Sequence, residues 1–193
     1  MLQVTKAEDV IDHGLSLGAD FAELFVERSL TNAISTLSSQ VQSVESGIDF
    51  GIGVRLVFGS KVLYGYTNKT EAEELKRIMG ELAAMDLRDP RVSLQAFDYS
   101  APVEHHPAHR ILSADADVDS KVAYLMAADA AARASSNLIS QTRGACRQKE
   151  QRIEIFNSEG LHTTDARNYV RATLTAIASD GQDQATGMWS DGG

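Results

Sequence analysis

Cysteine, proline and long apolar runs are all scarce in this 193-residue chain, and each scarcity excludes a class of protein. The single cysteine, Cys146, cannot form an internal disulfide, which predicts a reducing, cytoplasmic environment. No apolar run approaches the roughly 20 residues that cross a bilayer, and the first residues lack the profile of a signal peptide. With 3 prolines, 14 glycines and 43% hydrophobic residues, the composition excludes a disordered chain.

Basic residues are also in the minority. The 18 Lys and Arg residues against 27 Asp and Glu residues give a formal net charge of −9. An acidic surface repels phosphate backbones, which argues against sequence-independent binding of DNA or RNA. The length suits one large domain or two small ones, and either can form a core without metals or disulfides.

Two motifs of common enzymes are missing or incomplete. A catalytic zinc site of the zincin type needs a His-Glu pair and a second histidine one helical turn away, and none of the five histidines here precedes a glutamate. Gly51 and Gly53 lack the third glycine of a dinucleotide-binding loop, and a predicted strand follows where a helix should begin, so we interpret them as a glycine-rich approach to that strand. A Ser-His-Asp triad is not excluded by residue spacing alone.

Three histidines lie close together in the sequence EHHPAH at 104–109. Neutral imidazoles are good zinc ligands, so His105, His106 and His109 are candidate metal ligands. Adjacent residues of an extended chain point to opposite sides, however, and Pro107 stiffens the path to His109. A solvated surface loop is therefore favoured, and a small metal-binding protein that uses these histidines is an alternative.

A cysteine and an acidic stretch are two further candidate functional features. Cys146 lies near Arg143, Arg147 and Lys149, and positive charge lowers the pKa of a thiol, but no histidine partner is identifiable and an inert thiol is favoured. The acidic stretch DADVD at 115–119 lacks the central glycine and terminal glutamate of an EF-hand loop. We interpret it as the N-cap of a helix.

The sequence predicts three helices. Capping-box spacing of Thr5 with Glu8, and of Thr70 with Glu73, places the first two helix starts, and the third helix covers about 120–134. The residues predicted to face the core recur with the helical period. They are Val10, Ile11 and Leu15, then Leu75, Ile78, Met79 and Leu82, and finally Val122, Leu125 and Met126.

Alternating or apolar runs predict the strands. They occupy 21–27, 33–37, 41–44, 52–58, 61–66, 92–99, 138–148, 151–156 and 169–178. Gly59-Ser60 and the segment 157–160 are predicted turns. Because helices and hairpins are segregated along the chain, we expect the α+β class, with one or more antiparallel sheets and packed helices.

The order of the elements suggests two similar helix-plus-sheet subdomains. ISTLSS at 34–39 can be aligned with IEIFNS at 153–158, and the Val-Arg pair at 54–55 with that at 170–171. We therefore expect an internal duplication with subdomains 1–85 and 119–193, joined by a surface connection at 86–118. Chance similarity between two sets of alternating strands is the alternative.

Several segments together resemble the N-terminal region of the TldD/PmbA family, whose older name is modulator of DNA gyrase. They are GADFAELFVERS at 18–29, GIGVRLV at 51–57, YGYTN at 64–68, KVAYL at 121–125, DAAARA at 129–134, IFNSEG at 155–160, YVR at 169–171 and ASDG at 178–181. No single piece is diagnostic, but their order and spacing over nearly the whole chain make the match specific. The GVR variant at 53–55 favours the TldD side of the family over the PmbA side.

The resemblance implies a soluble bacterial or archaeal protein with a role in proteolysis. In the family, a TldD-type subunit is similar to a zinc-dependent peptidase, with a His-Glu-x-x-x-His motif in its C-terminal region. It pairs with a PmbA-type subunit that lacks this motif. Such complexes cleave unfolded or leader-bearing peptides and are associated with peptide-antibiotic maturation and antitoxin turnover.

This chain departs from the family pattern because it contains no His-Glu pair. No catalytic, cofactor-binding or metal-ligating residue of the family can be assigned to any position, and the zinc is expected in a C-terminal catalytic domain that these 193 residues do not include. We expect an N-terminal domain, inactive by itself, that forms a homo- or heterodimer with a TldD/PmbA-type subunit.

The expected role of such a domain is to shape the assembly and to help enclose an unfolded or leader peptide. An exposed sheet edge could add an extended peptide as another strand, since main-chain pairing tolerates varied side chains. Neither nucleic acid nor a membrane is an expected partner, and the acidic composition gives the gyrase role no support. The alternative is a standalone, non-enzymatic module that binds a protein partner.

Overall fold

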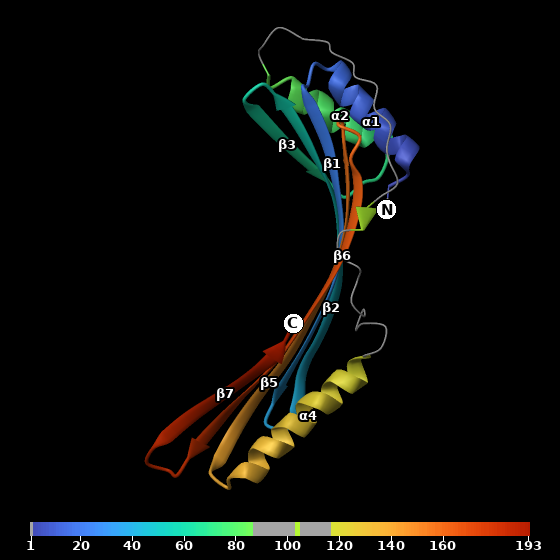
Figure 1. Cartoon of the computed structure of the whole chain (residues 1–193). Coiled ribbons are helices and arrows are strands. Elements are labelled where there is room, and N and C mark those ends of the chain that lie inside the picture. The colour runs from blue at the N-terminus through green and yellow to red at the C-terminus, as the bar shows by residue number, and fades with distance from the viewer. Residues whose placement is uncertain (1, 87–102, 105–116) are drawn as a thin grey trace. The chain divides into compact units, whose positions relative to one another are not determined.

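The computed structural model describes residues 2–86, 103–104 and 117–193. The elements in chain order are α1 (Val4–Ser16), β1 (Phe21–Leu37), β2 (Gln40–Phe58), β3 (Lys61–Thr67), α2 (Ala72–Ala83), β4 (Val103–Glu104), α4 (Val118–Ser135), β5 (Ile139–Asn157), β6 (His162–Ser179) and β7 (Gln184–Gly192) (Figure 1). The strands form one seven-stranded sheet in the order β3-β2-β1-β5-β6-β4, and β7 pairs with β6. The expected α+β class is confirmed.

Contacts divide the chain into two compact units. Unit 1 comprises Met1–Arg28, Asp49–Pro107 and Arg152–Ala166, and unit 2 comprises Ser29–Ile48, Ala108–Gln151 and Arg167–Gly193. The four long strands β1, β2, β5 and β6 each contribute residues to both units. The units therefore differ from the contiguous subdomains 1–85 and 119–193 that the order of elements suggested, and an internal duplication stays a prediction.

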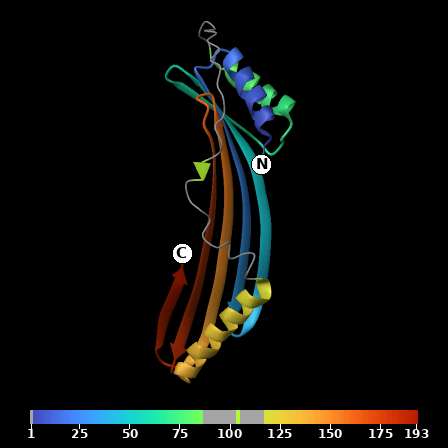
Figure 2. The same cartoon turned by 45° about the vertical axis from the view of Figure 1, so that its right-hand side comes forward.

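In unit 1, α1 and α2 lie together on one face of the sheet (Figures 1 and 2). Every residue predicted to line the inner faces of these two helices is buried, from Val10 in α1 to Leu82 in α2. They pack against alternate residues of the strands, among them Leu24 of β1, Leu56 of β2 and Phe156 of β5, each fully buried. This apolar contact supplies the main stabilisation of both helices.

A glycine allows α2 to approach β3 closely. A Cβ atom placed on Gly65 would lie 2.4 Å from Cγ2 of Ile78, which is shorter than any ordinary carbon contact. On the same helix, a Cβ atom placed on Gly80 would meet nothing within 4 Å. Gly65 is therefore required for packing, whereas Gly80 is a helix-interior glycine without a packing role.

The two predicted capping boxes are wrong. The N-cap of α1 is Gln3 and that of α2 is Glu71, and neither side chain makes a capping hydrogen bond. Ahead of α1, the backbone N–H of Leu2 instead donates to Oε2 of Glu154, at 3.0 Å. A contact with a distant strand thus holds the chain where α1 begins, which residue spacing within the helix cannot reveal.

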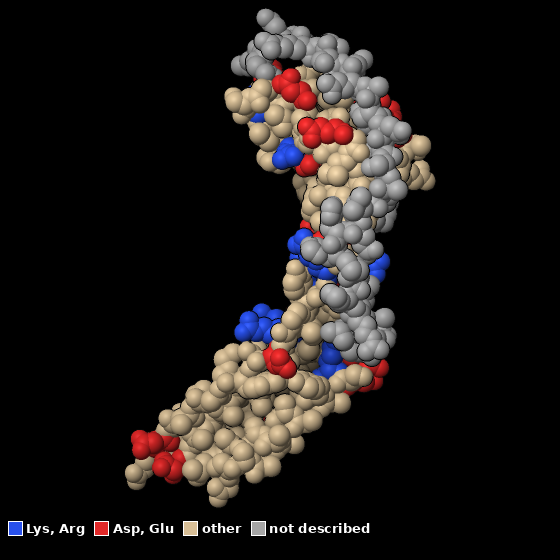
Figure 3. Space-filling view, in the orientation of Figure 1, with Lys and Arg blue, Asp and Glu red and all other residues tan. Residues whose placement is uncertain are grey.

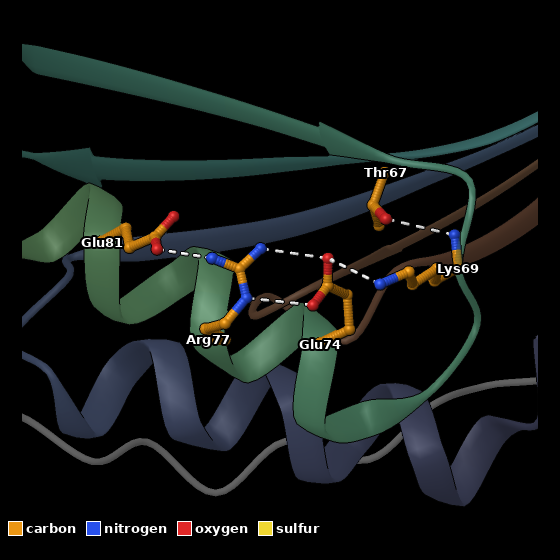
Figure 4. Close-up of polar contacts among 5 residues, drawn as sticks. All are labelled: Thr67, Lys69, Glu74, Arg77 and Glu81. Carbon is orange, nitrogen blue, oxygen red and sulfur yellow. Dashed lines mark hydrogen bonds and ion pairs between the residues drawn. The ribbon is translucent and has the colours of Figure 1, made fainter.

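The exposed face of α2 carries a small ionic network (Figure 4). Arg77 forms ion pairs with Glu74, one turn before it, and with Glu81, one turn after it, and Lys69 lies 3.9 Å from Glu74. The hydrogen bond from Arg77 is the main cause that lowers the pKa of Glu74, and the same carboxylates raise the pKa of Arg77. Solvent screens these contacts, so they contribute little to stability.

The strands are longer than the sequence pattern indicated. The predicted strands 21–27 and 33–37 are parts of β1, 41–44 and 52–58 are parts of β2, and 138–148 and 151–156 are parts of β5. Polar residues interrupt the apolar alternation, but the backbone still pairs with strands on both sides. The turns at Gly59 and Gly160 are confirmed, with φ of 61° and 80°, while 92–99 lies outside the described residues.

Within the part of the chain that the structure describes, no helix combines the length and the apolar character that crossing a membrane requires.

Candidate functional site

Helix α4 is attached to the sheet of unit 2 by a small apolar cluster. Leu125 of α4 packs against Ile34 of β1 and Cys146 of β5, with Val122 and Val170 at the margin. Asp117 forms the N-cap of the helix, because its carboxylate accepts a hydrogen bond from the backbone N–H of Ser120 at 2.7 Å. This bond lowers the pKa of Asp117. The capping role predicted for the acidic stretch is confirmed at this residue.

A buried carboxylate adds a second attachment. Asp129 of α4 accepts hydrogen bonds from the hydroxyl groups of Ser39 and Thr142 and from Nε of Arg133. Burial raises the pKa of Asp129, but the three donors outweigh it, and the net pKa lies below the usual value. Ser39 belongs to the β1–β2 turn, where Ser38 and Ser39 both have positive φ. Asp129 therefore joins the helix, this turn and β5.

Strand β7 forms a hairpin with β6 that the sequence did not predict. The strands are antiparallel, with Arg171 opposite Gly192 and Ser179 opposite Gln184. Val170 and Gly193 exchange both of their backbone hydrogen bonds. Because the bonded pairs of an antiparallel ladder alternate, the main-chain groups of Ala185, Gly187, Trp189 and Asp191 point toward β6.

The intervening residues of β7 direct their main-chain groups away from β6. Thr186, Met188 and Ser190 each present one N–H and one C=O on that side, where no described strand pairs with β7. All nine residues of β7 are exposed, and the run from Gln184 to Ser190 contains neither charge nor proline. Charged residues and proline usually protect the edges of natural sheets. The described part of β7 from 184 to 190 has neither, so its edge can pair with another chain.

Two aromatic side chains lie beside the hairpin. The rings of Trp189 on β7 and Tyr124 on α4 have centroids 6.4 Å apart and are tilted by 43°. Both rings remain close to half exposed, at 45% and 48%. An aromatic pair in this position can contact the side chain of a peptide that lies along the edge.

A cleft of about 340 Å³ lies between part of α4 and the sheet, beside the apolar cluster. Its lining includes Lys121 and Tyr124 of α4, Cys146 and Gln148 of β5, and Val170 of β6. The Gln148 side chain is buried; its Nε2 donates to Asn168, and its Oε1 has no hydrogen-bond partner among the described residues. Burial raises the pKa of Cys146 although Lys121 opposes this, which supports the interpretation of an inert thiol.

Two further sequence features lie within regular secondary structure in the described part of the chain. Gly51 and Gly53 lie inside β2, and a strand rather than a helix follows them. The segment GLSLG at 14–18 has the Gly-x-Ser-x-Gly pattern of a nucleophile elbow, but Ser16 is in the last turn of α1 and its hydroxyl donates to the carbonyl oxygen of His13. It therefore lacks the strand-to-helix turn that an elbow requires.

Metal-ligating side chains do not gather in the described part of the chain. No group of three or more His, Cys, Asp or Glu residues there could hold an ion, and His105, His106 and His109 lie outside it. A buried pair does occur in unit 1, where Nε2 of His162 lies 3.0 Å from Oε1 of Glu154 and the His162 ring stacks on Phe156. Since Glu154 also accepts from Leu2, this pair has a structural role.

The fold defines the class as an α+β domain, and no described strand pairs with the outer edge of β7. Residues 22–85 match the family model described as PmbA/TldA metallopeptidase domain 1, and residues 111–192 match that of the PmbA/TldA metallopeptidase central domain. Together the two matches cover most of the chain. The chain belongs to this metallopeptidase family, TldD/PmbA.

One curated relative covers nearly the whole chain. The metalloprotease TldD homolog of Haemophilus influenzae is 21% identical over 187 residues, which are 96% of this chain and 38% of that protein. The chain therefore spans well under half the length of this relative. The expected family resemblance is confirmed.

Solved structures share the fold at low sequence identity. A protein described as a candidate modulator of DNA gyrase from Bacteroides thetaiotaomicron has a TM-score of 0.76 at 13% identity, over 97% of this chain and 44% of its own. A protein with the same description from Thermotoga maritima has a TM-score of 0.78 at 11% identity, over 97% of this chain and 42% of its own. TldE from Thermococcus kodakarensis has a TM-score of 0.70 at 17% identity, over 97% of this chain and 42% of its own.

Proposed function

We propose that this chain is the peptide-holding part of a TldD/PmbA-family metallopeptidase and is inactive by itself. The family match supports the link to proteolysis, and the lack of a His-Glu pair in the sequence leaves the chain without the family's metal motif. In this proposal, zinc and the hydrolytic residues belong to a further C-terminal region. Zinc would there activate a water molecule for attack on the peptide bond.

The open edge of β7 is the single observation that carries the peptide-holding role. An extended peptide placed beside it can form main-chain hydrogen bonds with Thr186, Met188 and Ser190. This mode of binding reads the backbone and tolerates varied side chains. It suits an enzyme whose substrates are unfolded or leader-bearing peptides of different sequence.

The proposed assembly is a homo- or heterodimer with a TldD/PmbA-type subunit. In such a dimer, a peptide paired with β7 would be held in an extended form, which is the conformation that a peptidase cleaves. Pairing also removes the peptide's conformational freedom before the reaction and so lowers the entropic cost of the chemical step.

Replacing Met188 with proline tests the proposed pairing. Proline removes an N–H that faces away from β6, so the hairpin keeps its own hydrogen bonds while the edge loses a donor. We expect an unstructured, uncharged 12-residue peptide with a fluorescent label to bind M188P about tenfold more weakly than the wild type, measured by anisotropy. M188V keeps the N–H and should bind like the wild type.

Hydrogen exchange gives a second measurement that requires no substitution. On peptide binding, the amides of Thr186, Met188 and Ser190 should become protected, while those of Gly187 and Trp189, already bonded to β6, should change little. Equal peptide affinity of M188P and the wild type, or no added protection at the three outward amides in the bound state, would overturn the proposal.

A further inference from the structure

Charge is unevenly divided between the two units. Among the described residues, unit 1 carries 16 acidic and 8 basic side chains, whereas unit 2 carries 8 acidic and 7 basic ones. On the face drawn in Figure 3, acidic side chains predominate over the part that holds α1 and α2. Nearly all of the net negative charge of these residues therefore belongs to unit 1, and unit 2 is close to neutral.

A groove of about 620 Å³ in unit 2 collects several of these basic side chains. It is lined by residues of β1, β5, β6 and β7, including Arg147 and Lys149 of β5 and Tyr169 and Arg171 of β6. These four residues are exposed, and they alternate along β5 and β6 with the less exposed Gln148 and Val170, which line both this groove and the cleft beside α4. By this alternation, the basic side chains lie on the sheet face opposite α4.

The groove has a clear excess of positive charge. Three of its lining residues are basic, and Asp191 is the only acidic residue among them. Asp191 accepts a hydrogen bond from the backbone N–H of Gly192, and Arg171 makes a long contact of 3.4 Å with the hydroxyl of Ser190. An anion bound in the groove would form charge-assisted hydrogen bonds with these basic side chains.

The spacing of the cations matches an extended polypeptide. Arg147 and Lys149 are two residues apart on one strand, which separates their Cα atoms by roughly 7 Å. Carboxylates two residues apart in an extended peptide have the same spacing, as in Asp-x-Asp or Glu-x-Glu. Guanidinium groups bind such carboxylates with two parallel hydrogen bonds, and the half-exposed Tyr169 ring offers apolar contact.

We propose that this groove binds an acidic stretch of an extended polypeptide, with carboxylates at alternate positions held by Arg147, Lys149 and Arg171. This proposal rests on the proposed function, which takes the bound molecule to be a peptide substrate. It adds that the substrate carries acidic side chains. A peptide is favoured over a nucleic acid because the formal charge of the whole chain, −9, opposes a long polyanion.

Matched peptides and matched variants test the groove. A labelled, unstructured peptide with three Asp-x repeats is compared by anisotropy with the same peptide carrying Asn in place of Asp. We expect the wild-type chain to prefer the Asp peptide by about fivefold or more at low salt, and the preference to shrink as salt increases. The double variant R147Q/R171Q should lose this preference. The control R152Q removes an exposed charge from β5 outside the groove and should keep it.

The possible outcomes distinguish the groove proposal from the proposed pairing at β7. Equal binding of the Asp and Asn peptides by the wild type, or a preference retained by R147Q/R171Q, would overturn the groove proposal while leaving the test of M188P unaffected. Stronger binding of a single-stranded DNA of equal charge than of the Asp peptide would also overturn it. A preference that is lost in R147Q/R171Q but unchanged in M188P would support the groove, because main-chain pairing at β7 does not distinguish the Asp peptide from the Asn peptide.

Discussion

At the scale of residues, buried polar contacts decide how α4 and α1 are attached. Asp129 joins α4 to a turn with two left-handed serines, and Glu154 joins the start of α1 to β5 and β6. Each carboxylate satisfies donors that would otherwise be buried without partners, which costs about 1–3 kcal/mol per group. These two side chains therefore contribute to stability beyond the apolar cores that they border.

Replacing Asp129 with asparagine should destabilise the chain in a pH-dependent way. The folded-state pKa of Asp129 is lowered, so its contribution is present above the ordinary aspartate pKa of about 3.9 and is lost as the pH falls through the folded-state pKa. We expect D129N to unfold about 1–3 kcal/mol more easily at pH 7, with a smaller difference near pH 3, measured by urea titration.

The exposed Asp119 on the same helix provides the control for this prediction, and D119N should change stability by no more than ~0.5 kcal/mol. A D129N effect that was the same at pH 7 and pH 3 would contradict the assigned ionised state.

Asp117 and Asp129 show which residue roles can be predicted from the sequence. The N-cap at Asp117 was predictable because a cap depends only on the three residues that follow it. The role of Asp129 was not, because its partners Ser39 and Thr142 are far away along the chain. Its only local signal is the pair with Arg133 four residues later, which equally suits a solvated helix face.

At the scale of elements, close contact of α2 with β3 depends on the missing side chain of Gly65. We expect G65A to lower the free energy of unfolding by about 1–3 kcal/mol, because the added methyl group clashes with Ile78. The matched substitution G80A, which lies in α2 and adds its methyl group in open space, should raise the free energy of unfolding by about 1 kcal/mol through helix propensity. Thermal and urea unfolding of the two variants give both values, and shifts of the same sign would contradict this packing.

The elements themselves were predictable to different degrees. The helical period correctly identified the inner faces of α1 and α2, because apolar residues that recur every three or four positions lie on one side of a helix. Strand β7 was missed because its residues are all exposed and no alternation marks it. Its register depends on pairing with β6, and so the candidate edge could not be derived from its own sequence.

At the scale of the whole molecule, the proposed function assigns peptide binding to this chain and hydrolysis to a catalytic region of the family. The chain supplies an open strand edge and, in the same unit, a basic groove. The family match could be expected from the sequence, because the short segments that carry the resemblance keep the family's order over nearly the whole chain. The groove could not, because β1, β5, β6 and β7 bring its residues together from distant positions.

The most direct test of the account measures bound zinc and peptide hydrolysis for the purified 193-residue chain. Zinc is quantified by mass spectrometry after incubation with the metal, and cleavage of an unstructured peptide is followed in parallel. The account predicts less than stoichiometric zinc and no hydrolysis, with cleavage appearing when a family C-terminal region bearing His-Glu-x-x-x-His is joined to the chain. One zinc ion per chain together with peptide-bond hydrolysis by these residues alone would contradict it.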